Sequence, residues 1–391
     1  MIRAKCLHDQ CVTSFWRLVL MLSMVGMAGC STKPEPVRSV INIPPTEMQD
    51  PVIVPVPKTE PAPRQVAPPV VTNTPPPSHG IEPAPIASAP QTRPTVANPA
   101  SWTALDTWAS QNGLSKPKQV VNGKMVNFLV SGPNGTLKIT IGSQVVYWNG
   151  TEIWLGFQAK SADGHPYLNA LDVQKSVRPL FFPSKPLHHA KVIVIDPGHG
   201  GSDNGSRSIV SAKHEKDYTL DVSQRLEKLL VAAGWKVFLT RTADSDIAVT
   251  NRVVFAEKHH ADLFLSVHFN SYLTPEQQGI ETYCLTPVGM TSNLTRGYED
   301  NPRMVFPNNV HDEDNFHYAI NFHRALLKST HGLDRGVRRA RFMGVIRAEN
   351  FPAILVECGF LSNPREAQDI NTAGYRQKIA QGLANALLEM E

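Results

Sequence analysis

The chain of 391 residues carries little net charge, few cysteines and no long apolar run beyond its first 30 residues. Its formal net charge is +4, from 38 Lys and Arg against 34 Asp and Glu. Nucleic-acid binding relies on clustered basic residues that neutralise phosphates, so this balance argues against a nucleic-acid partner. After the N-terminal segment, no stretch reaches the roughly 18 apolar residues that a membrane-spanning helix requires.

The first 30 residues resemble a secretory signal. Basic residues precede an apolar run at 18–27, and Ala-Gly then stands directly before Cys30. This order of regions is typical of signals that are cleaved on export. The Ala-Gly-Cys ending resembles a bacterial lipoprotein box, in which Cys30 is lipidated; ordinary signal cleavage is the alternative. Ser31, directly after Cys30, resembles an outer-membrane sorting pattern. We therefore expect a periplasmic protein that lipid on Cys30 anchors to the outer membrane.

Only two of the five cysteines are then left in the exported chain. Cys6 and Cys11 would leave with the signal, and Cys30 would carry lipid. Cys284 and Cys358 remain in an oxidising compartment. Both fall on predicted strands, so we expect buried free thiols, and a disulfide between them is the alternative.

Composition divides the rest of the chain into three regions. Residues 31–100 are dominated by proline and predict a disordered linker that acts as a semi-stiff tether. Residues 101–185 contain short β-prone runs separated by glycine turns, a hairpin pattern. We expect a small, mostly β accessory module there, which opens with a helix at 101–110 and weakly resembles copper-amine-oxidase N-terminal-like repeats. Wall binding or spacing is its expected role.

Residues 186–391 alternate between strand-like and helix-like patterns. We expect helices at 216–233, 251–260 and 374–390, with a strand at 236–240. In the second helix, Val254 and Ala256 should face inward. This alternation predicts an α/β domain, with a mainly parallel twisted sheet and helices on both faces.

Two apolar runs in this region lead into histidines about 70 residues apart. The first is VIVIDPGHGG with His199, and the second is ADLFLSVHFNS with His268. Both patterns predict buried strands, and ligands bind at the carboxyl edge of such sheets. Two imidazoles at one edge need only a carboxylate to make a three-ligand zinc site with an open position. Glu215 is the candidate, although a helix start favours a carboxylate without any metal; His214 and Asp217 are rivals.

Several motifs follow one another through this half of the chain. They are IDPGHGG, EKD at 215–217, TR at 240–241, NR at 251–252, SVHFNS and PAILVECGFLSN. In this order they resemble the zinc-dependent N-acetylmuramoyl-L-alanine amidases of bacterial cell-wall remodelling, which have an amidase type 3 catalytic domain. The resemblance implies His199, Glu215 and His268 as zinc ligands, Glu357 as the catalytic carboxylate, and peptidoglycan as the partner.

The implied reaction is hydrolysis of the amide between the lactyl group of N-acetylmuramic acid and L-alanine of the stem peptide. Zinc held by two neutral imidazoles and one carboxylate keeps net positive charge, so it activates water and polarises the scissile carbonyl. Glu357 fits the group that removes the proton of the water and then protonates the leaving amine. Two rival functions are a non-catalytic, wall-tethering lipoprotein that binds peptidoglycan and a zinc peptidase acting on peptidoglycan cross-links.

Other charged residues of this half have two interpretations each. Asp196 could orient His199 through its second ring nitrogen or cap the loop. Arg241 and Arg252 match the family and equally suit structural ion pairs. Five arginines precede Glu357 and form either a solvated face or a rim that binds carboxylates of the stem peptide. They are Arg335, Arg338, Arg339, Arg341 and Arg347.

A polar insertion at 286–315 departs from the family pattern and contains three carboxylates at 312–314. Long loops in compact domains are usually functional or disordered. In regulated members of the family, an element in this region covers the zinc until an activator removes it. The insertion therefore either shields the metal, which implies a protein activator, or shapes the substrate groove.

Overall fold

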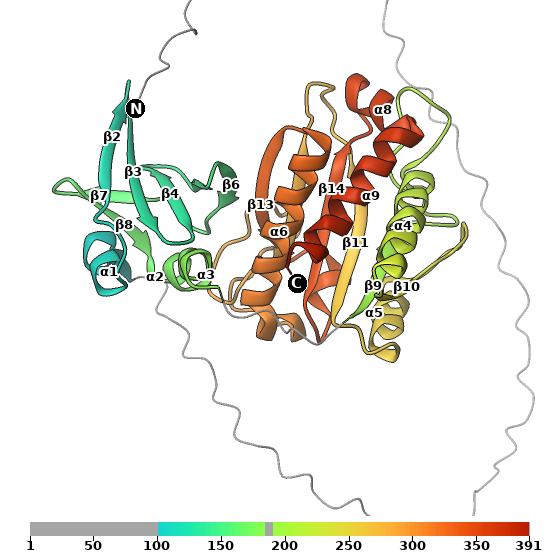
Figure 1. Ribbon diagram of the computed structural model, residues 1–391, viewed down its shortest axis with the longest axis horizontal. Helices are drawn as coiled ribbons and strands as arrows, with labels where there is room; N and C mark the ends of the chain where they lie inside the picture. Colours follow the sequence, from blue (N-terminus) through green and yellow to red (C-terminus); the bar gives the residue numbers. More distant parts are fainter. Residues whose placement is uncertain (1–100, 184–190, 391) are drawn as a thin grey trace, which may run out of the picture. The chain divides into compact units, whose positions relative to one another are not determined.

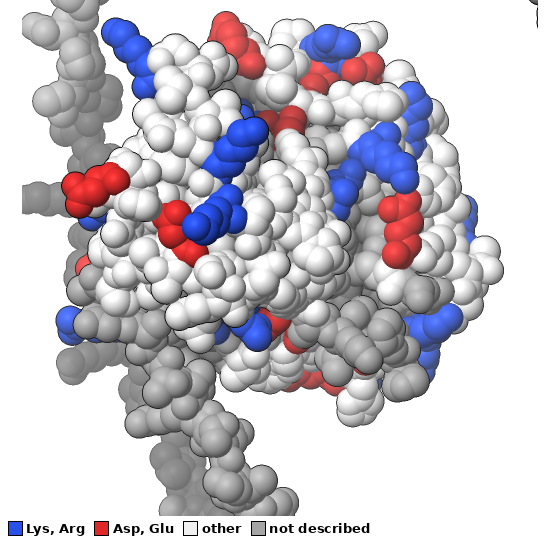
Figure 2. All heavy atoms as spheres, turned by 60° about the vertical axis from the view of Figure 1, so that its left-hand side comes forward, with Lys and Arg blue, Asp and Glu red and all other residues white. Residues whose placement is uncertain are grey.

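The computed structural model of the protein describes residues 101–183 and 191–390. The predicted signal, Cys30 and the predicted linker lie outside the described residues. Within the described ranges, no helix is both long and apolar enough to cross a membrane. Charged side chains of both signs are interspersed on the face drawn in Figure 2, which agrees with the small net charge.

One large mixed sheet organises the structure (Figure 1). Four neighbouring strands run parallel, in the spatial order β10 (Lys236–Leu239), β9 (Val192–Pro197), β11 (Leu263–Asn270) and β14 (Ala353–Phe360). Next to them, β12 (Ile280–Leu285) pairs antiparallel with β14 and parallel with β13 (Asp334–Ala340). β12 and β14 are buried along their whole length, as expected for strands covered on both faces.

Helices cover both faces of this sheet. On one face lie α4 (Glu215–Ala232), α6 (Asp312–Thr330) and α9 (Ala373–Leu388), which share a large hydrophobic core with the strands. On the other face, α5 (Val249–Lys258) and α7 (Gly344–Arg347) pack on a second core that includes Val194, Phe264 and Leu355. α8 (Pro364–Asn371) follows β14. The predicted α/β class, with a mainly parallel sheet between helices, is confirmed in this part of the chain.

Residues 101–183 extend the same sheet with an antiparallel meander. Its strands, outward from β13, are β6 (Thr151–Trp154), β5 (Val145–Trp148), β4 (Gly135–Thr140), β3 (Met125–Gly132) and β2 (Lys118–Asn122). Val337 of β13 pairs with Ile153 of β6. A separate sheet contains β1 (Trp102–Ala104), β8 (His165–Asn169) and β7 (Lys160–Ala162). The helices of this segment are α1 (Leu105–Gln111), α2 (Ala170–Asp172), the π-helix Val173–Val177 and α3 (Arg178–Phe181), and a 3-10 helix at Pro307–His311 precedes α6.

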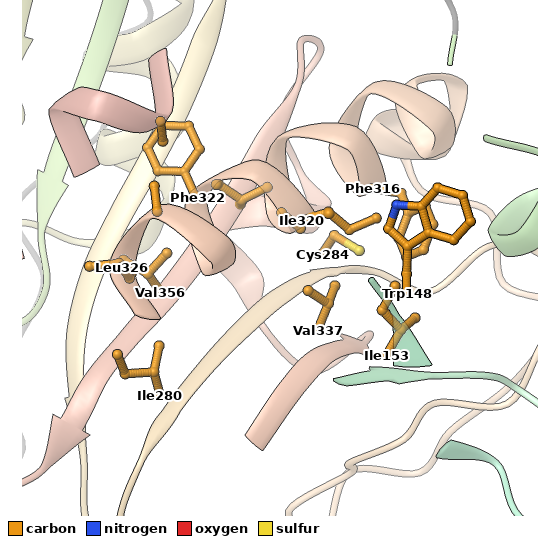
Figure 3. Packing of buried hydrophobic residues seen from close by; sticks show 14 of the residues in the cluster. Trp148, Ile153, Ile280, Cys284, Phe316, Ile320, Phe322, Leu326, Val337 and Val356 are labelled. Atoms are coloured by element: carbon orange, nitrogen blue, oxygen red, sulfur yellow. The ribbon is translucent and has the colours of Figure 1, made fainter. Parts of the chain in front are cut away.

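The meander and the α/β region also share one hydrophobic core. Trp148 and Ile153 belong to the same buried cluster as Phe316, Val337 and Cys284 (Figure 3). The division into an accessory module at 101–185 and a catalytic domain at 186–391 stays a prediction. What the structure shows is a sheet and a core that run through both segments.

Three local expectations can be compared with the structure. Val254 was expected to face inward, which is wrong, because 59% of it is exposed. α5 begins at Val249, and its buried face contains Val253 and Ala256, which lie three residues apart on one side of the helix. The helix expected from residue 101 starts only at Leu105, because Trp102–Ala104 pairs with β8 as a strand. The two cysteines of the described chain are buried and free, as expected.

Candidate active site

The carboxyl ends of β9, β11 and β14 bring three ionisable side chains to one edge of the sheet. His199 follows β9 by two residues, and His268 lies near the end of β11. Glu357 on β14 is in register with His268. Because these strands are parallel neighbours, their carboxyl ends open into one crevice.

Glu215, the first residue of α4, joins the two histidines. Its Oε1 lies 3.1 Å from Nε2 of His199 and 2.9 Å from Nδ1 of His268. One donor atom of each side chain lies within 4.8 Å of the others, so the three residues could hold a metal ion. Two imidazole nitrogens and one carboxylate oxygen are a common donor set of catalytic zinc sites.

His214 and Asp217, the rivals of Glu215, support the start of α4 instead. The Asp217 carboxylate accepts a hydrogen bond from the backbone N–H of His214 at 2.9 Å. This contact is one of those that cap the start of the helix. Among the described residues, the group that could hold a metal ion includes neither of them.

Two glycines allow these side chains to approach closely. Gly198 lies against the ring of His268, where a Cβ atom would stand 2.3 Å from Cε1. At Gly205, with a φ of +63°, a Cβ atom would stand 2.6 Å from His199 and 2.7 Å from Glu215. His199 itself has a φ of +62°. Such backbone strain in a residue other than glycine is concentrated at functional sites.

Asp203 orients the ring of His199. Its Oδ2 lies 2.9 Å from Nδ1 of His199, which leaves Nε2 facing Glu215. A carboxylate on the second ring nitrogen commonly supports a metal-binding histidine. Asp196, one of whose two predicted roles was to orient His199, contacts other residues instead, and Asp203 was not among the predicted site residues. The spacing of four residues after His199 was the signal that could have identified it.

Asp196 has a different position, at the base of the site. Its carboxylate accepts hydrogen bonds from Thr240 at 2.6 Å, Arg252 at 2.5 Å and Ser266 at 2.9 Å. Arg252 also donates to the backbone carbonyl of His199 at 2.9 Å. Asp196 and Arg252 therefore form a buried ion pair that fixes the loop carrying His199.

The charges within the cluster stabilise one another. Burial disfavours the charged form of Glu215, but hydrogen bonds and positive charge from His199 and His268 hold its pKa well below its usual range. Burial also disfavours protonated His199, yet Glu215 and Asp203 together raise its pKa to about 9. Glu215 is therefore ionised at neutral pH, the form in which a carboxylate binds a cation.

Glu357 is buried beside the cluster and has one oxygen without a partner. Its side chain is 6% exposed, and Oε2 has no hydrogen-bond partner among the described residues. Burial raises the pKa of Glu357 to about 7, although the charge of His268 opposes the shift. A carboxyl group with a pKa near neutrality can both accept and return a proton.

A cleft of about 470 Å³ opens over these side chains. The two histidines, Glu215 and Glu357 line it together with residues 342–345 from the start of α7. Arg296, from the insertion after β12, also lines this cleft. A lone arginine in a polar loop has no recognisable sequence pattern, so Arg296 was not among the predicted site residues.

The described lining of the cleft contains none of the five arginines that precede β14. Arg339 and Arg341 are buried. Arg335 and Arg338 form ion pairs with Glu281 at 2.7 and 3.6 Å. These contacts support a structural role and not the rim that the sequence analysis considered for this segment.

The carboxylates of the insertion are also remote from the cleft lining. Asp312, the first residue of α6, lies 3.0 Å from Nζ of Lys175. Asp314 lies 3.9 Å from Nδ1 of His311. The described lining includes no residue of 312–314. The structure therefore does not show the shielding by these carboxylates that the sequence analysis considered.

Known proteins are similar to the part of the chain that contains this site. A family model described as N-acetylmuramoyl-L-alanine amidase matches residues 193–389. N-acetylmuramoyl-L-alanine amidase AmiA of Escherichia coli (strain K12) is 30% identical over 219 residues, covering 51% of this chain and 75% of the relative. AmiC of Neisseria meningitidis serogroup B is 31% identical over 216 residues, covering 50% of this chain and 51% of the relative.

A solved structure is similar to the same region. It is the catalytic domain of CwlV, an N-acetylmuramoyl-L-alanine amidase from Bacillus (Paenibacillus) polymyxa var. colistinus, at 30% identity and a TM-score of 0.43. The match covers 51% of this chain and 97% of that chain. The region matched by the family model includes His199, Glu215, His268 and Glu357. The chain belongs to the N-acetylmuramoyl-L-alanine amidase family.

Proposed function

We propose that this family member is a zinc-dependent enzyme that hydrolyses the amide between the lactyl group of N-acetylmuramic acid and L-alanine of the stem peptide in peptidoglycan. One observation carries the proposal: His199, Glu215 and His268 converge beside the unpartnered oxygen of Glu357. The products would be a glycan strand with a free lactyl carboxylate and a stem peptide with a free amino terminus.

The three converging side chains fit a zinc ion. A ring nitrogen of each histidine lies within hydrogen-bond distance of Glu215 Oε1, so one cation could take the place of the protons in these two contacts. Bound zinc would activate water and polarise the scissile carbonyl. The chain itself holds the donors in place. Asp203 orients His199, and the backbone N–H of Phe269 donates to Glu215 Oε1 at 3.0 Å.

Glu357 would move the proton. Its Oε2 would take a proton from the attacking water as the new C–O bond forms, and deliver it to the L-alanine nitrogen as the C–N bond breaks. Burial supports this assignment, because it raises the pKa of Glu357 to about 7 and makes both steps accessible near neutral pH.

We also propose that lipid on Cys30 anchors the enzyme on the periplasmic side of the outer membrane, with residues 31–100 as its tether. Whether the enzyme requires a protein activator stays a prediction, and the digestion described next tests it.

Digestion of purified sacculi by the purified protein alone would test these assignments. We expect release of intact stem peptides with new L-alanine amino termini, detected by mass spectrometry. Fragments cut between peptide residues would identify the zinc peptidase instead, and binding without release would identify the non-catalytic wall-tethering protein. Release only after a periplasmic extract is added would show that an activator is required.

A further inference from the structure

The first part of the insertion after β12 is held firmly at its base. Arg341, which is fully buried, donates to the backbone carbonyls of Pro287 and Met290, both at 2.7 Å. The same guanidinium lies 2.7 Å from the carboxylate of Asp300. Asp300 also accepts hydrogen bonds from the backbone and hydroxyl of Ser292 at 2.8 Å. Residues 287–300 therefore form a closed loop, which we call the arginine loop.

The β meander holds one side of the arginine loop. Thr291 Oγ1 donates to the carbonyl of Gly156 at 2.7 Å, and Asn293 Nδ2 donates to the carbonyl of Leu155 at 2.8 Å. Asn293 Oδ1 accepts from the backbone N–H of Arg339 on β13 at 2.9 Å. Asn293 thus connects the end of β6 to the α/β region, and the loop lies between them.

The tip of the arginine loop places Arg296 in the cleft. Arg296 has a φ of +47°, and its guanidinium donates to Asn270 Oδ1 at 3.0 Å. It lies 5.6 Å from the centre of the Phe342 ring and 4.0 Å from Oε1 of Glu357. The side chain is still 47% exposed, so part of its planar array of N–H donors faces the cleft.

Asn270 is itself fixed for this contact. Its Nδ2 donates to Glu281 Oε2 at 2.9 Å, which leaves Oδ1 as the acceptor for Arg296. Glu281 is buried and paired with Arg335 and Arg338. These contacts hold the Arg296 guanidinium at the cleft wall before any substrate arrives.

We propose that Arg296 binds a carboxylate of the stem peptide next to the scissile amide, and that the β meander positions it there through Thr291 and Asn293. This inference rests on the proposed function and names the part of the substrate that the cleft selects. A guanidinium forms paired, charge-assisted hydrogen bonds with a carboxylate, which fix orientation as well as affinity. Arg296 thereby sets the peptide relative to Glu357, 4.0 Å away.

The test compares two soluble muramyl peptides, one with free stem-peptide carboxylates and one with these groups converted to carboxamides. We expect the wild-type enzyme to prefer the free acid by about 10- to 100-fold in kcat/KM, mainly through KM, because charged hydrogen bonds have this strength. Arg296→Ala should lose most of this preference, so that its kcat/KM values for the two substrates become similar. Arg296→Lys should keep only part of the preference, since lysine retains the charge but lacks the paired N–H donors of the guanidinium.

Arg303→Ala is the matched control, because Arg303 is an exposed arginine of the same insertion that does not appear in the described lining. It should keep the full preference. If Arg296→Ala slows both substrates equally, Arg296 acts on Glu357 or on folding and the proposal is wrong. If wild type has no preference, the proposal is also wrong. If wild type cleaves neither substrate, the proposed function itself fails.

A second arm tests the contribution of the meander. The Thr291→Val, Asn293→Ala double variant should lose the preference for the free acid. Adding Arg296→Ala should cause little further loss, because the double variant and Arg296→Ala remove the same contact with the substrate carboxylate. Circular dichroism on heating checks folding. If Asn293→Ala does not fold, Thr291→Val alone, which removes a single hydroxyl, should reduce the preference. Retention of the full preference in the folded variants would overturn the positioning role.

Discussion

The two carboxylate oxygens of Glu357 have different surroundings. Oε1 lies 4.0 Å from the guanidinium of Arg296, whereas Oε2 has no hydrogen-bond partner among the described residues. A buried oxygen without a partner is costly in free energy and is ready to accept a proton from water. In the proposed reaction, Oε2 would therefore be the oxygen that takes the proton.

Glu357→Gln should separate proton transfer from metal binding. The amide keeps the shape of the side chain but cannot take a proton, so we expect kcat to fall by at least about 100-fold. Zinc content, measured by elemental analysis, should stay at one ion per chain. His268→Ala, in contrast, should lose zinc and activity together. A Glu357→Gln enzyme with kcat within tenfold of wild type would contradict the general-base assignment.

Glu349 is a second buried carboxyl group, outside the proposed mechanism. It is fully buried, and neither of its oxygens has a hydrogen-bond partner among the described residues. Burial, helped by the negative charges of Glu257 and Asp196, raises the pKa of Glu349 to about 9. The folded protein therefore holds this proton over a pH range in which the unfolded chain, with a pKa near 4.5, releases it.

This difference in proton binding gives a stability prediction with a definite sign. Because the folded state binds the extra proton, the contribution of Glu349 to stability falls as pH rises from about 4.5 towards 9. Glu349→Gln cannot ionise. It should therefore raise the free energy of unfolding at pH 8 by on the order of a few kcal/mol, and raise the unfolding temperature with it. The gain should shrink towards pH 5. Calorimetry at several pH values measures it, and a gain independent of pH would refute the assignment.

The strands that form the site were predictable, and one loop beside it was not. β9, β11 and β14 are short apolar runs, and a histidine or glutamate at the end of each must reach the same edge of a parallel sheet. Sequence therefore located His199, His268 and Glu357. The loop that carries Arg296 is hydrogen-bonded to a segment about 135 residues earlier. No local pattern records a contact over that distance.

β12 and β14 explain why their cysteines stay apart. The antiparallel register pairs Glu281 with Glu357, so Cys284 and Cys358 are separated by four steps along the strands, roughly 13 Å. A disulfide requires Cα atoms within about 7 Å. The thiols are also fully buried, and burial raises the pKa of both.

Alkylation should report the same arrangement. At pH 8 the native protein should protect Cys284 and Cys358 from iodoacetamide, because the reactive thiolate is disfavoured and buried. In denaturant without a reductant, both should be alkylated completely. Peptide mass spectrometry quantifies each cysteine. A linked peptide containing both, or rapid labelling of the native protein, would contradict this description.

The described chain folds around a sheet that passes from the meander into the α/β region. Val337 pairs with Ile153 where they meet, and Lys175 forms an ion pair with Asp312. The buried guanidinium of Arg339 donates to the carbonyl of Lys175 at 2.7 Å. Removing residues 101–183 would therefore expose apolar core and take this acceptor away from Arg339, which is costly.

A fragment of residues 186–391 should consequently be less stable than the intact protein. We expect its unfolding temperature to be lower by at least about 5 °C, since 1 kcal/mol shifts a domain of this size by 2–4 °C. Arg339→Met in the fragment should recover part of the lost unfolding temperature, because it removes a charge whose hydrogen-bond acceptor is missing. Differential scanning calorimetry provides the comparison. Equal unfolding temperatures would show that residues 101–183 do not stabilise the remainder of the chain.

The hydrogen bonds from Thr291 and Asn293 to the end of β6 bear on how mutants of this protein should be interpreted. In a random screen for lost activity, substitutions around residues 151–156 should be recovered beside those in the cleft. A geneticist who maps these hits onto the linear sequence would assign the meander a substrate-binding role of its own. Purified variants that bind sacculi normally but have lost the preference for the free-acid substrate would show that these substitutions act through the arginine loop.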